Sequence, residues 1–183
     1  MPLVSVNVDA IPIMRTVDLS NWIYDSGITR FRMNAKIMEV YSNDGEPYWY
    51  FPEKIFVEQL DSLFNLEASI LADTAYRYEK KGLWRAVRNV VVKNSQGTVF
   101  ETSELFWNEK APPNDGYVFY THKPVKIIYP DGTVSYGQNG FRSNQSLSPL
   151  FLFNVKADLL IDESTDSPQQ NTINSDSIKL QRQ

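Results

Sequence analysis

A regular alternation of apolar and polar residues is the feature of this sequence that most restricts its fold. From Phe64 to Asp73 an apolar residue falls at every second position, and Leu71 is the one exception. Successive side chains of a β-strand point to opposite faces, so this run predicts a strand with one dry and one wet face. The dry face is expected to contain Phe64, Leu66, Ala68, Ile70 and Ala72. The same period recurs in Phe31, Met33, Ala35 and Ile37.

Other segments rich in valine, isoleucine and aromatic residues predict further strands, because these side chains suit a pleated surface. The segments are 48–51, 54–57, 83–93, 98–107, 117–121, 125–129, 134–136 and 150–155. Short stretches with glycine, asparagine or aspartate lie between many of them and favour tight antiparallel turns. The pattern predicts an all-β fold, either a sandwich, a barrel or a jelly roll. A short helix is expected only at Asp18–Tyr24, and Asp61-Ser62 is expected to form a turn.

The strand expected at 83–93 contains two alternating sets of residues, and only one of them can face the core. The more apolar set is expected to point inward, although Arg88 interrupts it. This set is Trp84, Ala86, Val90 and Val92.

The length of 183 residues fits one domain with additional residues at its ends. Residues 1–17 are interpreted as an N-terminal segment and residues 18–162 as the domain. Residues 163–183 form a polar tail with few core-forming residues, which is expected to be disordered. No segment has the ~20 apolar residues of a membrane-spanning helix, and the first residues lack the basic and apolar regions of an intact signal peptide. The protein is therefore either cytosolic or a matured form of an exported chain.

Composition excludes several kinds of chemistry. The chain has no cysteine and one histidine, His122, which excludes thiolate metal sites, a cysteine nucleophile and a multi-histidine metal centre. The net charge of −4 disfavours nucleic-acid binding. No Gly-x-Ser-x-Gly motif accompanies His122, and Glu101 and Glu104, the nominal carboxylate pair, are expected to be solvated rather than catalytic. We therefore expect neither an enzyme nor a metal or cofactor site.

Aromatic residues are the remaining indication of a function. Trp49, Trp84 and Trp107 could fill an ordinary core, or they could line an apolar groove that holds an acyl chain. Burial of each methylene of such a chain contributes about 0.8 kcal/mol, so a lipid carrier needs apolar surface rather than reactive groups. A different class of protein, a carbohydrate-binding or adhesive β-sandwich module of a cell-surface lipoprotein, would use the same tryptophans as stacking platforms.

Five segments of the chain, taken in order, resemble the motifs of one family. They are 25–33, 72–84, 89–97, 100–107 and 140–145. Together they resemble the LptC family, the periplasmic component of the lipopolysaccharide-export ABC transporter, over about Asp18 to Val155. Related LptA/OstA-like domains share the spacing more loosely. The chain has Arg88-Asn89-Val90 where the family has Gly-Asn-Val, which puts a glycine bulge at that point in doubt.

The resemblance implies a twisted antiparallel β-jelly roll, LptA/LptC-like, with an open apolar groove for the acyl chains of lipid A. It implies a non-catalytic component without a cofactor, which relays lipopolysaccharide from the inner-membrane ABC transporter to an LptA-like periplasmic bridge protein. Such domains would join edge to edge by β-augmentation, receiving at the N-terminal strands and donating at the C-terminal ones. The implied location is the periplasm, tethered to the inner membrane by an N-terminal anchor absent from this chain.

The alternating pattern and the resemblance together nominate two sets of residues. The set expected to contact lipid is Phe31, Met33, Phe64, Leu66, Ile70, Ala72, Trp84, Ala86, Val90 and Val92. The set expected to form the partner edge is Leu150, Phe151, Leu152, Phe153, Asn154 and Val155.

Overall fold

The computed structural model describes residues 11–25, 28–42, 46–111, 117–144, 147 and 150–158. All regular structure in these residues is antiparallel β-strand, so the predicted all-β class is confirmed. The strands are β1 (Met14–Asp25), β2 (Ile28–Tyr41), β3 (Tyr48–Phe51), β4 (Ile55–Leu60), β5 (Leu66–Ala72), β6 (Thr74–Tyr78), β7 (Leu83–Asn94), β8 (Val99–Asn108), β9 (Phe119–Thr121), β10 (Val125–Ile128), β11 (Val134–Gly137), β12 (Phe141–Ser143), β13 (Leu150–Leu152) and β14 (Val155–Asp158).

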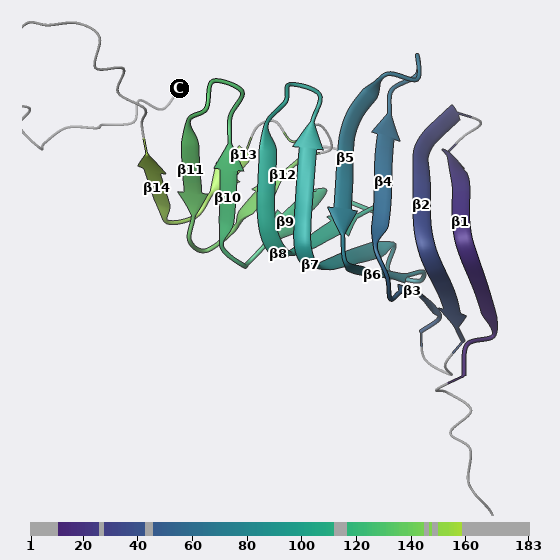
Figure 1. Cartoon of the computed structure of the whole chain (residues 1–183). Coiled ribbons are helices and arrows are strands. Elements are labelled where there is room, and N and C mark those ends of the chain that lie inside the picture. The colour runs from purple at the N-terminus through teal and green to yellow at the C-terminus, as the bar shows by residue number, and fades with distance from the viewer. Residues whose placement is uncertain are drawn as a thin grey trace, which may run out of the picture.

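Three long strands, β2, β7 and β8, have different neighbours along their two halves, and this divides the sheet into two layers. The front layer has the order β1-β2-β4-β5-β7-β8-β10-β11-β14, and the back layer has the order β2-β3-β6-β7-β8-β9-β12-β13. In Figure 1 the front-layer strands stand in a row from purple β1 to yellow-green β14, with the short strands of the back layer behind them. The pairings β2-β4-β5-β7-β6-β3 return to β2 and so form a closed ring.

The space between the layers is filled by apolar side chains from both. Met33, Val92 and Ile127 of the front layer have no accessible surface. A row of aromatic rings crosses the back layer, with centroid distances of 5.7 Å from Phe51 to Trp84, 5.6 Å from Trp84 to Trp107 and 6.0 Å from Trp107 to Phe119. These distances lie in the range in which aromatic pairs attract each other, so the row adds to the stability that burial provides.

Strand β7 carries a bulge where it passes from the back layer to the front layer. Its pairing with β8 shifts between Val87 and Val90, and Arg88 and Asn89 adopt positive φ angles of 64° and 46°. Both bulged residues are exposed, and the Arg88 guanidinium donates a hydrogen bond to Thr74 Oγ1. The bulge therefore forms without the glycine that the resemblance associates with it.

Because two residues are taken up by the bulge, the alternation of β7 keeps its phase on both sides of it. The predicted inward set is confirmed, since all four of its members are buried, and Arg88 does not interrupt the interior. They are Trp84, Ala86, Val90 and Val92.

The helix predicted at Asp18–Tyr24 is wrong, because these residues lie in β1 and pair with β2 from Val17↔Ile37 to Ile23↔Phe31. Leu19 and Ile23 pack against the core. Residues four apart share a face in a strand as well as in a helix, so their spacing was compatible with both. Strand β1 begins at Met14 and thus crosses the boundary expected between residues 17 and 18. The predicted tail, 163–183, lies outside the described residues.

The turn predicted at Asp61-Ser62 is present, but it extends further than expected and changes the positions of Phe64 and Leu66. Asp61 accepts hydrogen bonds at Oδ1 from the backbone N–H groups of Leu63 and Asn65, each at 2.8 Å, so β5 begins only at Leu66. Phe64 lies in the turn with a φ of 63° and is 63% exposed, and Leu66 is 46% exposed. The prediction that these two residues share the dry face of Ala68 and Ala72 is therefore wrong.

Acidification is expected to loosen this turn. Hydrogen bonds from the Asn65 side chain, and then from the backbone N–H groups of Asn65 and Leu63, hold the pKa of Asp61 below its ordinary value of 3.8. Because this pKa is lower in the folded protein than in the unfolded chain, the contribution to stability is complete above 3.8 and is lost as the pH falls through the folded value. An NMR titration of the Asp61 carboxyl carbon and the Leu63 and Asn65 amides measures this. The Asp61→Asn variant, which cannot titrate, serves as the control. A midpoint at or above 3.8 would contradict the expectation.

The single strand predicted at 150–155 is wrong, because the segment forms two strands in different layers. Strand β13 pairs with β12 in the back layer, and β14 pairs with β11 in the front layer. Asn154, with a φ of 54°, makes the crossing, and its carbonyl accepts a hydrogen bond from the Gln138 N–H at 3.0 Å. Asparagine tolerates such a conformation better than most residues, which explains why the chain turns at this point.

Candidate functional site

The interior between the layers is where most of the nominated lipid-contact residues meet. Apart from Phe64 and Leu66, all of them are buried in the core or pack directly against it. Those brought together are Phe31, Met33, Ile70, Ala72, Trp84, Ala86, Val90 and Val92. They come from β2, β5 and β7, so the inward-facing residues of three separate segments of the sequence form one apolar surface.

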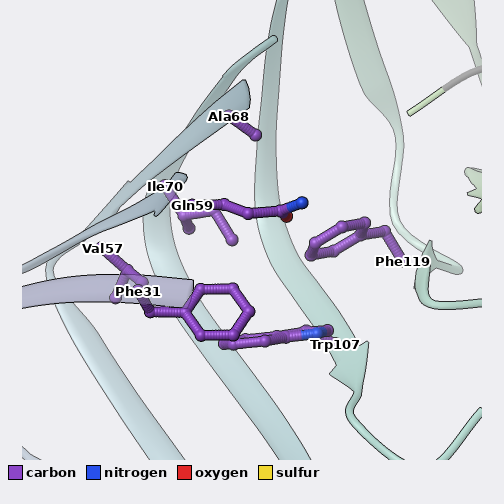
Figure 2. A pocket seen from close by; sticks show the side chains of 7 residues that line it. All are labelled: Phe31, Val57, Gln59, Ala68, Ile70, Trp107 and Phe119. Atoms are coloured by element: carbon purple, nitrogen blue, oxygen red, sulfur yellow. The ribbon is translucent and has the colours of Figure 1, made fainter. Parts of the chain in front are cut away.

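Two small cavities lie in this interior and have three wall residues in common, Val57, Ile70 and Trp107. The first has a volume of about 10 Å³ and is shown in Figure 2. The second, next to Trp84 and Leu105, has a volume of about 20 Å³. Each volume is about that of a single water molecule. The two layers would therefore have to separate locally before an acyl chain could lie between them.

The wall of the first cavity contains one polar side chain, that of Gln59. Its neighbours across the sheet are Phe31 in β2 and Ala68 in β5, and in Figure 2 its amide points into the space in front of Phe119. Gln59 is only 6% exposed. The amide Nε2 donates a hydrogen bond of 2.5 Å to Glu67 Oε2, whereas Oε1 is buried and has no hydrogen-bond partner.

Five residues of the cavity wall are missing from the nominated lipid-contact set, namely Val57, Gln59, Ala68, Trp107 and Phe119. Val57 and Phe119 lie in segments that were predicted as strands, and the apolar residues of those segments could have been nominated in the same way. Gln59 continues the alternation of Ile55 and Val57 past the expected end of that strand. Because Gln59 is polar, a search for buried residues by hydropathy does not find it.

Both ends of the sheet present exposed apolar side chains. At the N-terminal end, β1 exposes Met14, Val17 and Trp22 to between 42% and 53%. At the C-terminal end, β13 and β14 are the last strands of the back and front layers. They expose Phe151 and Val155, to 46% and 54%. Unpaired edges with apolar side chains are the surfaces to which another strand can add.

Each of the three tryptophans considered as carbohydrate platforms has at least one ring face covered. Trp84 and Trp107 are each 5% exposed and stack on each other. The Arg77 guanidinium lies 4.7 Å from the centre of the Trp49 ring. On the outer surface of the back layer, Tyr50 and Tyr76 stack at 4.9 Å, so these rings too cover each other. Trp84 and Trp107 therefore offer no open ring face on which a sugar could stack, and Arg77 occupies one face of Trp49.

The polar residues considered for metal binding or catalysis have other contacts in the part of the chain that the structure describes. No group of three or more histidine, cysteine, aspartate or glutamate residues is close enough to hold a metal ion there. His122 is exposed and contacts Tyr120 edge-on. Glu104 forms an ion pair with Arg85 at 2.6 Å, and Glu101 forms one with Lys126 at 3.4 Å. A search of the same residues for a helix able to span a membrane finds none.

Comparison with known proteins adds no relative from which a function could be transferred. No protein-family model matches the chain, and no curated protein sequence matches it. The function must therefore be argued from the geometry of the interior and the edges.

Proposed function

We propose that this protein is a non-catalytic lipid carrier of a lipopolysaccharide-export system, in which acyl chains of lipid A pass between the two layers of a twisted β-jelly roll. The observation that carries the proposal is the apolar interior between the layers, which is built from alternating residues of β2, β5 and β7. The resemblance of five sequence segments to the LptC family supports the same class of cargo.

Local separation of the layers supplies the groove that this function requires. An acyl chain that enters the interior gains about 0.8 kcal/mol for each methylene removed from water. This gain offsets the loss of contacts between side chains of the two layers, such as Phe31 and Trp107, whose rings lie 4.7 Å apart. The two cavities mark where the packing is already incomplete, so the side chains around them lose the fewest contacts when they move apart.

The exposed edges supply the contacts to neighbours in the same pathway. The inner-membrane ABC transporter would adjoin the β1 end, and an LptA-like periplasmic bridge protein would add a strand at the β13 and β14 end. Leu150–Val155, the nominated partner edge, lies at that end in both layers. In this proposal the protein lies in the periplasm and is tethered to the inner membrane at its N-terminal side.

A photo-crosslinking residue at Ile70 is expected to capture lipopolysaccharide in cells, because Ile70 lines both cavities. The same residue at Leu71, the next position in β5, should give no adduct. Leu71 is 41% exposed and faces away from the interior, so the pair differs only in the side of the sheet. Adducts are detected by immunoblotting of the purified protein against lipopolysaccharide. No adduct at Ile70, or equal adducts at the two positions, would contradict the proposal.

A further inference from the structure

The side-chain oxygen of Gln59 is buried and lacks the hydrogen-bond donor that a buried acceptor requires. It is 6% exposed, and its Oε1 lies among the apolar walls of the cavity with no hydrogen bond. The other wall residues are Phe31, Val57, Ala68, Ile70, Trp107 and Phe119. A buried acceptor without a donor is destabilising, and native proteins rarely keep one unless water, an ion or a ligand satisfies it.

The hydrogen bond made by Nε2 fixes the orientation of the Gln59 amide. Nε2 donates to the carboxylate of Glu67 at 2.5 Å. Rotating the amide by half a turn would place Oε1 against that carboxylate, and two acceptors repel each other. The acceptor Oε1 therefore points into the interior, and a donor that forms a hydrogen bond with it must also lie in the interior.

We infer that Gln59 Oε1 accepts a hydrogen bond from a hydroxyl group carried by an acyl chain between the layers. The interior then prefers hydroxylated acyl chains over plain ones. This inference rests on the proposed function, since it names the kind of acyl chain that the same interior selects.

The preference follows from what happens to the acceptor when a chain enters. The cavity of about 10 Å³ has the size of one water molecule, which can donate to Oε1 when no lipid is bound. A plain chain displaces this water and leaves the acceptor unpaired, whereas a hydroxylated chain replaces its hydrogen bond. Sites built around a polar group discriminate against ligands that leave it unpaired. The net value of one such hydrogen bond corresponds to roughly a tenfold difference in affinity.

The test measures displacement of a fluorescent fatty acid from the full chain by tetradecanoic acid and by tetradecanoic acids with a hydroxyl at different carbons. With the natural sequence, at least one hydroxylated acid is expected to bind about tenfold more tightly than the plain acid. In the Gln59→Leu variant this preference should disappear, because leucine removes the acceptor while keeping a similar volume. Gln59→Met is the second variant, for use if the leucine variant fails to fold. Gln96→Leu, at an exposed position, is the matched control and should retain the preference.

The outcomes separate this inference from the function on which it rests. If the natural protein binds no fatty acid at all, the proposed function is overturned and the inference with it. If it binds plain and hydroxylated acids equally, or if the Gln59 variants keep the preference, the inference is overturned and the proposed lipid carrier stands. Loss of the preference in both Gln59 variants, with plain-chain binding retained, supports the inference.

Discussion

Replacing Trp107 with alanine is expected to lower the free energy of unfolding by about 3–5 kcal/mol, which is the usual loss when a large aromatic side chain is removed from a core. Trp107 is 5% exposed and contacts the rings of Phe31, Trp84 and Phe119. It also lines both cavities, so its removal would join them into a larger void that the surrounding strands cannot fill. Because a domain has about 5–15 kcal/mol of stability in total, the variant would be marginally folded.

Urea denaturation followed by circular dichroism measures this loss. Trp22→Ala is the matched control, because Trp22 is 42% exposed on β1 and contacts the Arg32 guanidinium, which lies 5.5 Å from the ring centre. The control is expected to lose less than about 1 kcal/mol. Equal losses in the two variants would mean that the row of aromatic rings does not hold the layers together.

Replacing Gly140 with alanine is expected to be about as damaging as the Trp107 change. Gly140 has a φ of +91°, and a Cβ at this position would lie 2.0 Å from the carbonyl oxygen of Thr121. No side-chain rotation can relieve a clash with backbone, so the connection between β11 and β12 must move. That movement breaks the hydrogen bond in which the Phe153 N–H donates to the Gly140 carbonyl at 3.1 Å. We expect a loss of more than about 3 kcal/mol.

Gly97→Ala separates the clash from the backbone conformation. Gly97 has a similar φ of +86°, but the nearest atom to its Cβ, in the Pro130 ring, is 3.6 Å away. Only the conformational penalty applies there, about 1–2 kcal/mol. Thermal denaturation of the two variants should therefore give a clearly lower midpoint for Gly140→Ala. Similar midpoints would show that the close approach to Thr121 is relieved by a small shift of the loop.

The sequence predicted those parts of the fold that depend on alternation alone. Ala68 and Ala72 are buried as expected, and β7 presents its expected face to the interior. In these strands each inward side chain lies between two neighbouring strands, so hydropathy and position agree. The all-β class follows from the same signal.

Long-range contacts decided the features that the sequence could not predict. Asp18–Tyr24 became a strand because β2 pairs along its whole length, and a spacing of four residues does not distinguish a strand from a helix. Phe64 left its expected face because Asp61 holds the turn with its side chain. The unsatisfied oxygen of Gln59 becomes visible only when β2, β4 and β5 are placed side by side.

Because β2, β7 and β8 belong to both layers, the two layers are held together more firmly between β2 and β8 than beyond β8. The closed ring β2-β4-β5-β7-β6-β3 resists widening, because its circumference can increase only if the hydrogen bonds between two neighbouring strands break. Beyond β8 the layers are joined by the chain crossings at 122–124, 138–140 and 153–154 instead of by strand pairing, so fewer backbone hydrogen bonds oppose their separation there. If lipid passes from the β1 end to the β14 end, as we propose, it moves from a section that resists opening into one that opens more easily.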